Sequence, residues 1–362
     1  MKKKILTIVG ARPQFIKASV ISRLINKTYN SEFEEILVNT GQHYDKNMSS
    51  IFFDDLKINK ANYNLNLGSF SNISQVSKIM VMLEKIINYE NPDLVLTYGD
   101  TNSTLAGSLA AAKTSIKLAH VEAGLRSNRY GMQEEINRII TDRISQFLFC
   151  PTNYAVENLK KEGIKKNVFN TGDIMLDSFN YVKSNFFSYD VLEKFNLKNK
   201  NYFFTTFHRA ENVDDYERLK NIIETMNYLS NYKDIIFPIH PRTKKNLKKF
   251  KIKLSSKIID VDPQSYPVVV NLISNCFAVI TDSGGLQKES YFANKPCITL
   301  RDETEWEKTV KLGYNILFSP QNLISEKVNI INSINKMPND FPSIFGEGNC
   351  GSKILEILKK LI

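Results

Sequence analysis

The sequence predicts an α/β protein with two doubly wound parallel sheets. Short runs rich in Val, Ile and Phe alternate with amphipathic segments along most of the 362 residues, which is typical of βαβ units. The alternation starts again after the polar stretch 183–201. The chain is also too long for one ordinary hydrophobic core. We therefore expect two similar Rossmann-like domains that face each other across a ligand-binding cleft.

The first half of the chain contains five clear strand signals and two amphipathic segments. The apolar run that opens the chain, followed by Gly-Ala-Arg-Pro, is read as a buried first strand. Strands are expected at 4–9, 36–39, 94–97, 117–120 and 147–150, with helices at 16–25 and 76–87. Strands alternate with loops and helices in this order, so the strands are expected to be parallel.

The second half repeats this order. Strands are expected at 202–206, 235–239, 257–261, 278–281 and 297–300, with helices between them. The last amphipathic helix, 352–361, is expected to pack on the first domain. The predicted domains are therefore 1–175 and 176–345, followed by a C-terminal helix in 346–362.

Composition narrows the class of protein. Hydrophobic residues make up 42% of the chain and charged residues 24%, which is ordinary for a globular protein. No apolar run approaches the ~20 residues that span a bilayer. The basic start, MKKK, precedes an apolar run that is too short for a signal peptide. We expect a cytoplasmic protein without a membrane partner.

The net charge of +10 comes mostly from Lys, in stretches such as 160–166 and 244–257. Nucleic-acid binding is one interpretation, and a solvated Lys-rich surface is the second. The chain has no interleaved Arg and aromatic platform and no nucleic-acid motif, so we expect no nucleic-acid partner. The four cysteines are far apart in sequence, which predicts buried free thiols. They are Cys150, Cys276, Cys297 and Cys350.

Three acidic residues follow predicted strands or begin helices within 97–138. Asp100 follows the strand at 94–97, Glu122 follows the strand at 117–120, and Glu134 begins the next helical segment. The carboxyl ends of parallel strands face one crevice in an open sheet. Three carboxylates there indicate proton-transfer chemistry rather than packing.

A second candidate site is the segment TDSGG (281–285), which follows a strand and opens a helix. Ser283, Gly284 and Gly285 could present backbone N–H groups to a phosphate. A simple Ser/Gly helix cap is the alternative. Glu289, one turn into the helix, could accept hydrogen bonds from ribose hydroxyls. Neither a P-loop nor a GxGxxG motif is present, so no redox cofactor is expected.

Two further features have competing interpretations. Arg12 follows the first strand and could reach an anionic ligand, although a plain turn explains the segment equally well. All four histidines, at 43, 120, 208 and 240, follow apolar runs at predicted strand ends. Packing explains such a pattern poorly for all four. No two of them are close enough in sequence to form a local pair of ligands, so we expect no metal.

Many ordered segments together resemble one family. They are GARPQFIKA (10–18), TGQHYD (40–45), YGDTNSTLAGSLAAA (98–112), HVEAGLRS (120–127), EEINR (134–138), TGD (171–173), FHRAEN (207–212), FPIHPR (237–242) and TDSGGLQKES (281–290). In this order they resemble the bacterial non-hydrolysing UDP-N-acetylglucosamine 2-epimerases, over nearly the whole chain. The resemblance implies the two-domain GT-B fold, a UDP-sugar substrate, no cofactor and a homodimer.

The resemblance also implies roles for individual residues. The family's catalytic set matches Asp100, Glu122, Glu134 and His208. Its UDP-sugar contacts match Arg12, Lys17, Arg138, Ser283, Gly284, Gly285 and Glu289. Gln133 stands where the family usually has Pro, and this change leaves the two glutamates after it in place.

Some segments resemble a particular branch of the family. GARPQFIKA, NYNLNLGS (62–69) and RDETEWEKTV (301–310) are similar to 2-epimerases of UDP-2,3-diacetamido-glucuronate. A pocket for the carboxylate of that sugar needs a cation, and Arg126 is one candidate. The expected substrate is UDP-N-acetylglucosamine, with the diacetamido uronate as the alternative. Three further candidate functions are a hydrolysing 2-epimerase, a GT-B glycosyltransferase and a non-enzymatic nucleotide-sugar-binding regulator.

Overall fold

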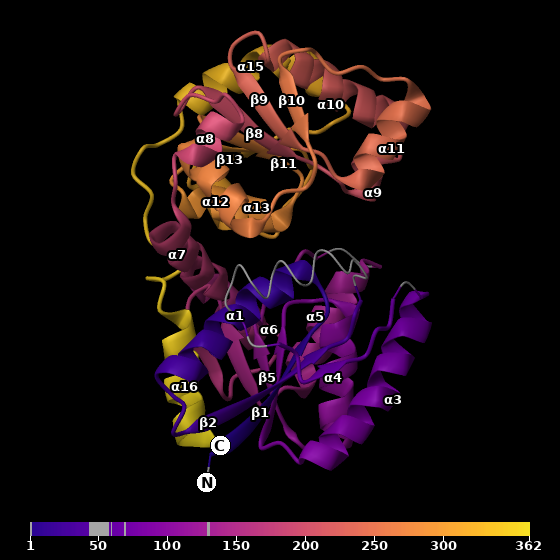
Figure 1. Ribbon diagram of the computed structural model, residues 1–362, viewed down its shortest axis with the longest axis vertical. Coiled ribbons are helices and arrows are strands. Elements are labelled where there is room, and N and C mark those ends of the chain that lie inside the picture. Colours follow the sequence, from indigo (N-terminus) through magenta and orange to yellow (C-terminus); the bar gives the residue numbers. More distant parts are fainter. Residues whose placement is uncertain (1, 43–57, 59, 69, 129–130) are drawn as a thin grey trace. The chain divides into compact units, whose positions relative to one another are not determined.

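The computed structural model describes residues 2–42, 58, 60–68, 70–128 and 131–362. The chain divides into two compact units. Unit 1 comprises Met1–Tyr181 and Ser343–Ile362, and unit 2 comprises Val182–Pro342. Each unit is an α/β layer structure with its own parallel sheet (Figure 1).

The described residues of unit 1 form a seven-stranded parallel sheet of order β3-β2-β1-β4-β5-β6-β7. The strands are β1 (Lys3–Val9), β2 (Phe33–Asn39), β3 (Tyr63–Asn64), β4 (Leu94–Tyr98), β5 (Lys117–Val121), β6 (Phe147–Cys150) and β7 (Val168–Asn170). The helices are α1 (Arg12–Lys27), α3 (Asn72–Glu90), α4 (Asn102–Lys113), α5 (Gln133–Ile144), α6 (Asn153–Lys161), α7 (Ile174–Phe186), which begins in this unit, and α16 (Cys350–Leu361).

Helices cover both faces of this sheet because strand side chains alternate between the two faces. Leu6 and Ile8 of β1 pack in one cluster with apolar residues of α3 and α4. Helix α1 lies on the opposite face and contacts α16 (Figure 1). Gly351 of α16 lies close to Val20 and Leu24 of α1. The C-terminal helix is thus part of unit 1.

The described residues of unit 2 form a six-stranded parallel sheet of order β10-β9-β8-β11-β12-β13. The strands are β8 (Tyr202–Thr206), β9 (Asp234–Pro238), β10 (Ile258–Val261), β11 (Ala278–Thr281), β12 (Cys297–Thr299) and β13 (Asn315–Leu317). The helices are α8 (Asp190–Lys194), α9 (Ala210–Val213), α10 (Tyr216–Leu229), α11 (Pro241–Phe250), α12 (Tyr266–Asn275), α13 (Gly284–Phe292), α14 (Glu307–Lys311) and α15 (Leu323–Asn335). Helices α10 and α15 pack in one core cluster, and α8 and α12 pack in another.

The predicted fold class is confirmed, since both sheets are parallel and covered by helices on both faces. Every predicted strand is present. The sequence prediction missed β3, β7 and β13, which are all edge strands of two or three residues. These strands are shorter than the apolar runs of four to eight residues that mark a buried strand, so the sequence pattern did not reveal them. The prediction also began the first helix too late, because α1 starts at Arg12.

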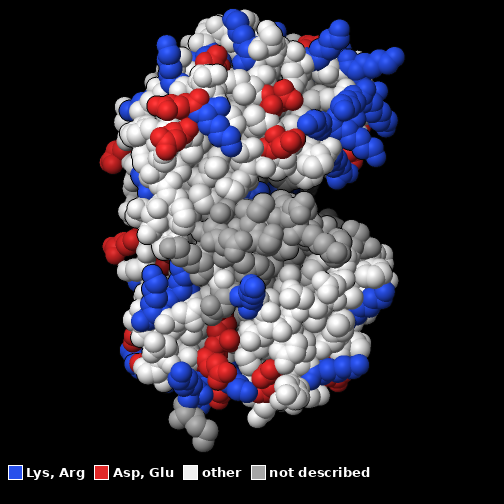
Figure 2. Space-filling view, in the orientation of Figure 1, with Lys and Arg blue, Asp and Glu red and all other residues white. Residues whose placement is uncertain are grey.

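A group of basic side chains lies on the surface of unit 2. Figure 2 shows a group of Lys and Arg side chains over the region of α11. All the basic residues of 241–257 are exposed: Arg242, Lys244, Lys245, Lys248, Lys249, Lys251, Lys253 and Lys257. No acidic residue interrupts this segment. Its exposure agrees with the interpretation of a solvated Lys-rich surface.

The cysteine prediction is confirmed, since all four cysteines are free and buried. Burial raises the pKa of the thiols of Cys276 and Cys297 to about 12. Within the part of the chain that the structure describes, no helix combines the length and the apolar character needed to cross a bilayer.

Candidate functional site

In unit 1 the strand order changes direction between β1 and β4, the position where doubly wound sheets bind ligands. The side chain of Gln14 joins the two segments that follow these strands. Its Oε1 accepts hydrogen bonds from the backbone N–H groups of Gly10 (2.9 Å) and Ala11 (3.1 Å). Its Nε2 donates to the backbone carbonyl of Tyr98 at 2.8 Å. These bonds place Arg12, at the start of α1, beside the turn that follows β4.

Asp100 follows β4 after one glycine and is held by helix α5. Its Oδ2 lies 2.5 Å from Nη2 of Arg138, a buried side chain. The Asn137 side chain donates to the backbone carbonyl of Asp100 at 2.8 Å. Arg138 also binds Glu135, with 2.8 Å between Nη1 and Oε2. The predicted substrate contact Arg138 is therefore paired to a predicted catalytic carboxylate.

Glu122 follows β5 directly and has an unusual backbone conformation. Its φ is 76°, a left-handed region that costs a non-glycine residue about 1–3 kcal/mol and is concentrated at functional sites. Its carboxylate forms an ion pair with Nζ of Lys17, and the two side chains are only 11% and 8% exposed. Lys17 was also predicted as a substrate contact. The structure thus brings a predicted cation to each of two predicted acidic residues.

The third predicted carboxylate has different surroundings. Glu134 lies in the first turn of α5 and is exposed. Its carboxylate has no ion pair or hydrogen bond within the part of the chain that the structure describes. Its neighbour Glu135 is buried and accepts hydrogen bonds from the backbone N–H groups of Ser127 and Asn128. Burial alone would raise the pKa of Glu135. The hydrogen bonds from Ser127 and the ion pair with Arg138 outweigh burial, so the pKa lies below its usual value.

Two predictions for this region need correction. His120 was expected on the loop side of its strand, yet its side chain is completely buried. It lies within β5, which continues one residue further than predicted. Arg126 was considered as a cation for a sugar carboxylate. Its Nη1 instead binds Asp142 at 2.8 Å, and its Nε binds Glu162 at 2.6 Å. Arg126 is therefore a buried structural cation.

In unit 2 the strand order changes direction between β8 and β11. Asp282, which follows β11 and is fully buried, joins the two segments there. Its carboxylate accepts hydrogen bonds from the backbone N–H groups of His208 (3.1 Å) and Arg209 (2.9 Å). The side chain of Asn212 donates to it at 3.1 Å. Asp282 therefore fixes the position of His208.

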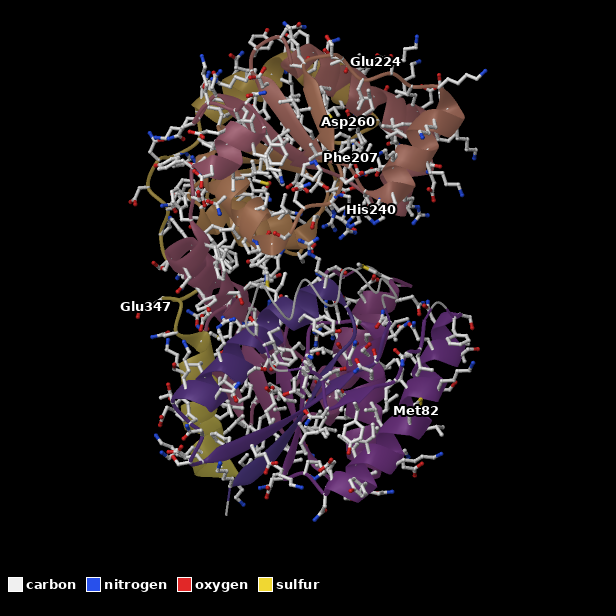
Figure 3. All side chains as sticks on the ribbon, in the orientation of Figure 1. Met82, Phe207, Glu224, His240, Asp260 and Glu347 are labelled. Atoms are coloured by element: carbon white, nitrogen blue, oxygen red, sulfur yellow. The ribbon has the colours of Figure 1, made fainter. Side chains whose placement is uncertain are left out.

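The imidazole of His208 is accessible and lies beside a second histidine. Its side chain is 43% exposed, and its Nδ1 lies 3.8 Å from the Asp282 carboxylate. The rings of His208 and His240 are 5.2 Å apart between centroids. His240 is the N-cap of α11, and Figure 3 labels it at that end of the helix. The structure thus brings together two of the four predicted strand-end histidines, while His43 lies outside the described residues.

Helix α13 begins with the predicted Ser-Gly-Gly segment. Ser283 is its N-cap, and its Oγ accepts a hydrogen bond from the backbone N–H of Leu286. A Cβ atom on Gly284 would lie 2.1 Å from a carboxylate oxygen of Glu305. A Cβ atom on Gly285 would have Oγ of Ser283, 3.9 Å away, as its nearest neighbour. Trp306 donates from Nε1 to the carbonyl of Gly284 at 2.9 Å. The helix start is thus capped and packed on one side but open at Gly285.

Glu289 completes the predicted set. It lies on α13 and is 5% exposed. Lys288, next to it, is also buried, and its Nζ lies 4.5 Å from the ring centroid of Trp306. The described residues contain no group of three or more His, Cys, Asp or Glu side chains that could hold a metal ion.

Sequence reasoning missed the buried residues that hold this site in place. Asp282 directly precedes the Ser-Gly-Gly segment, whose Ser and Gly residues favoured a phosphate interpretation. Asp142 lies on α5 with no motif around it. The signal available for both was an aspartate that follows two β-branched apolar residues and a threonine, in IITD (139–142) and VITD (279–282). Burial of such a carboxylate is costly unless hydrogen bonds compensate.

The fold and these two switch-point sites define a two-domain α/β protein of the GT-B type. The chain belongs to the UDP-N-acetylglucosamine 2-epimerase family, whose sequence profile matches residues 26–359. It is 48% identical to a UDP-N-acetylglucosamine 2-epimerase homolog of Methanococcus maripaludis, over 99% of this chain and 100% of the relative. It is 43% identical to the UDP-2,3-diacetamido-2,3-dideoxy-D-glucuronate 2-epimerase of Pseudomonas aeruginosa, over 99% and 100%.

A solved structure agrees over the whole chain. The crystal structure of Methanocaldococcus jannaschii UDP-GlcNAc 2-epimerase in complex with UDP-GlcNAc and UDP matches with a TM-score of 0.89 and 42% identity. The match covers 99% of this chain and 100% of that one.

Proposed function

We propose that this chain is a non-hydrolysing UDP-N-acetylglucosamine 2-epimerase, an isomerase that interconverts UDP-GlcNAc and UDP-ManNAc. The observation that carries the proposal is the arrangement at the ends of the neighbouring strands β4 and β5. There Asp100 and Glu122 are each ion-paired to a largely buried cation. Family membership along the full chain supports the same reaction.

The chemistry requires a base near C2 and help for the leaving UDP. The C2–H of the sugar is a poor acid until the C1–O bond to UDP breaks. One carboxylate takes the C2 proton, the C–H electron pair forms a C1–C2 double bond, and the C1–O pair leaves with UDP. A carboxylate on the opposite face returns a proton to C2 of this 2-acetamidoglucal. UDP then adds back at C1, so the atoms balance without a co-reactant.

We assign the proton transfers to Asp100, Glu122 and Glu134. His208 would protonate or hold the departing diphosphate. Lys17 and Arg138 would keep two of these carboxylates in place and also contact the substrate. The remaining contacts proposed for the UDP-sugar are Arg12, Ser283, Gly284, Gly285 and Glu289. Backbone N–H groups at a helix start suit a diphosphate, and the open surroundings of Gly285 support this role.

We further propose a cytoplasmic homodimer that needs no cofactor. Four free, buried cysteines suit a reducing compartment. Light scattering on the purified protein should give twice the 41.5 kDa of one chain. A mass of one chain would contradict the dimer.

The test is to incubate the pure protein with UDP-GlcNAc in D2O and to follow the products by NMR. We expect UDP-ManNAc that carries deuterium at C2. Free sugar with UDP would instead indicate a hydrolysing enzyme. Tight UDP binding without any product would indicate a nucleotide-sugar-binding regulator, and sugar transfer to an added acceptor would indicate a glycosyltransferase.

A second candidate substrate is UDP-2,3-diacetamido-glucuronate. The 43% identity to the Pseudomonas aeruginosa enzyme of that name and the segment RDETEWEKTV favour it. Comparison of kcat/KM for both sugars on one preparation decides between them. A hundredfold preference corresponds to about 2.8 kcal/mol, which is the scale of one charged hydrogen bond.

A further inference from the structure

One buried histidine connects the segments that carry the proposed acid residues. The ring of His120 is completely buried. Its Nε2 lies 2.7 Å from the backbone carbonyl of Gly99, and its Nδ1 lies 2.7 Å from Oδ1 of Asp142 on α5. The second oxygen of Asp142 accepts the backbone N–H of Gly124 at 3.0 Å. The pair thus ties together the turn after β4, the turn after β5 and helix α5.

The hydrogen-bond partners determine the charge on this ring. A backbone carbonyl can only accept a hydrogen bond, and an ionised carboxylate can only accept as well. Burial by itself raises the pKa of Asp142, but His120 and Arg126 outweigh burial and lower it. Both ring nitrogens of His120 therefore face acceptors, so both have to donate. A ring that donates from both nitrogens has a proton on each and carries a positive charge.

The surrounding groups balance this charge. Arg126 binds both Asp142 and Glu162, so the two cations and the two carboxylates compensate each other. The thiol of Cys150 lies close to this group, and burial raises its pKa, which keeps it neutral. A charge-compensated set of short hydrogen bonds is rigid and directional.

The hydrogen bond from His120 to Gly99 affects the backbone orientation of the proposed catalytic residue Asp100. The Gly99 carbonyl and the backbone nitrogen of Asp100 belong to one planar peptide group. A ring that holds this carbonyl therefore fixes the orientation of the backbone from which the Asp100 side chain projects. Arg138 holds the same side chain from α5, and α5 also carries Asp142.

We propose that His120 is a positioning residue, an imidazolium that holds the Gly99–Asp100 peptide and through it the Asp100 carboxylate in the geometry that proton transfer requires. This inference rests on the proposed epimerase function. Because the side chain is completely buried, it acts through Asp100.

Two variants of His120 each remove one of the two hydrogen bonds that the ring makes with Gly99 and Asp142. In His120→Gln the amide nitrogen takes the place of Nε2 and keeps a donor for Gly99. In His120→Asn the amide nitrogen takes the place of Nδ1 and keeps a donor only for Asp142. We expect kcat to fall about a hundredfold in His120→Asn, the cost of misplacing a catalytic group by about 1 Å, and less than tenfold in His120→Gln. KM should change little in either variant.

The control is Gln146→Ala, which removes a bond at the opposite end of β5. There Oε1 of Gln146 accepts the backbone N–H of Leu118 at 2.7 Å. This variant should lose stability and keep the wild-type kcat. Equal kcat values in the two His120 variants, or wild-type kcat in His120→Asn, would overturn the positioning role. Wild-type protein without epimerase activity would instead refute the proposed function.

A second measurement does not depend on how the variants fold. The chain has four histidines, so 15N-histidine labelling gives a simple NMR spectrum. We expect two slowly exchanging ring N–H signals from His120 in the wild-type protein at neutral pH. A single ring N–H signal from this buried residue would show a neutral imidazole and overturn the proposal.

Discussion

At the scale of single residues, the proposed acids differ in what surrounds them. Asp100 contacts Arg138 and Glu122 contacts Lys17, and both cations are less than one-tenth exposed. Glu134 is exposed at the start of α5. A carboxylate held by a cation keeps a fixed position for proton transfer, whereas an exposed one exchanges its proton with solvent. Reaction on two faces of a sugar needs more than one such group.

Amide substitutions of these residues should separate chemistry from binding. We expect Asp100→Asn, Glu122→Gln and Glu134→Gln each to lower kcat by ~10²-fold or more, the usual scale for a general acid or base. Affinity for UDP, measured by calorimetry, should stay near the wild-type value. Glu84→Gln on the exposed face of α3 is the matched control and should leave kcat unchanged. Near-normal rates in all three variants would show that the proposed site is wrong.

At the scale of elements, the start of α13 has two glycines with different surroundings. Gly284 is enclosed by Glu305 and by Trp306, and Gly285 is open. Glu305 in turn pairs with Arg301 at 2.8 Å, where both side chains are nearly buried. One glycine is therefore required by packing, and the second leaves space in front of the helix.

Alanine at these two positions should give opposite effects. Gly284→Ala should lower the melting temperature, because its methyl group displaces Glu305. Gly285→Ala should keep or raise stability by up to about 1 kcal/mol, since alanine favours helix. Its methyl group should still weaken UDP binding about tenfold or more. Thermal melts and calorimetry check both effects. Normal UDP affinity in Gly285→Ala would contradict a phosphate site at this helix start.

Hydrogen bonds connect helix α7 to the start of the C-terminal helix α16. Asp177 accepts hydrogen bonds from the backbone N–H groups of Gly351 (2.9 Å) and Cys350 (3.1 Å) at the start of α16. Burial raises the pKa of Asp177 to about 6 in spite of these bonds. Its folded pKa therefore exceeds the value of about 3.9 in an unfolded chain.

This shift predicts the direction of a pH effect on stability. Because the folded state binds this proton more tightly than the unfolded state, protonated Asp177 stabilises the fold. This contribution is complete below pH ~4 and is lost as pH rises through about 6. The loss should be on the order of 3 kcal/mol, from roughly two pKa units. Urea unfolding of wild type and Asp177→Asn measures it. The free energy of unfolding of the variant, relative to that of wild type, should increase between pH 4 and 7. A difference between the two proteins that does not change with pH would contradict the raised pKa of Asp177.

At the scale of the whole molecule, the two units carry different parts of the proposed chemistry. Unit 1 carries the three proposed acids, and unit 2 carries the proposed diphosphate-binding helix and the basic surface over α11 (Figure 2). Parallel sheets in both units place the proposed functional residues near the carboxyl ends of their strands.

Epimerase activity should be independent of divalent metals. Arg12, His208 and the N–H groups at the start of α13 are proposed to meet the diphosphate charge. We therefore expect the rate to persist after EDTA treatment and dialysis, and added Mg²⁺ to change it little. A reversible loss that Mg²⁺ or Mn²⁺ restores would contradict this expectation.

Local patterns were sufficient to predict the order of elements and the positions of the acids. Apolar runs of four to six residues mark the central strands, because both faces of a parallel sheet are buried. The residues that follow such a run lie at the carboxyl end of a strand, where ligands bind in open parallel sheets. Asp100 and Glu122 could therefore be located from the sequence. Family motifs added the roles proposed for them.

Tertiary structure alone decided which side chains meet. Arg126 pairs with Glu162, His120 with Asp142, and Asp282 with His208 across 36, 22 and 74 positions. Periodicity reports burial of apolar side chains, but it contains no information on which buried charge compensates another. Which charges pair depends on strand order and on the packing of helices over the sheet. Only the tertiary structure therefore showed that Arg126 is a buried structural cation and that His120 is buried between Gly99 and Asp142.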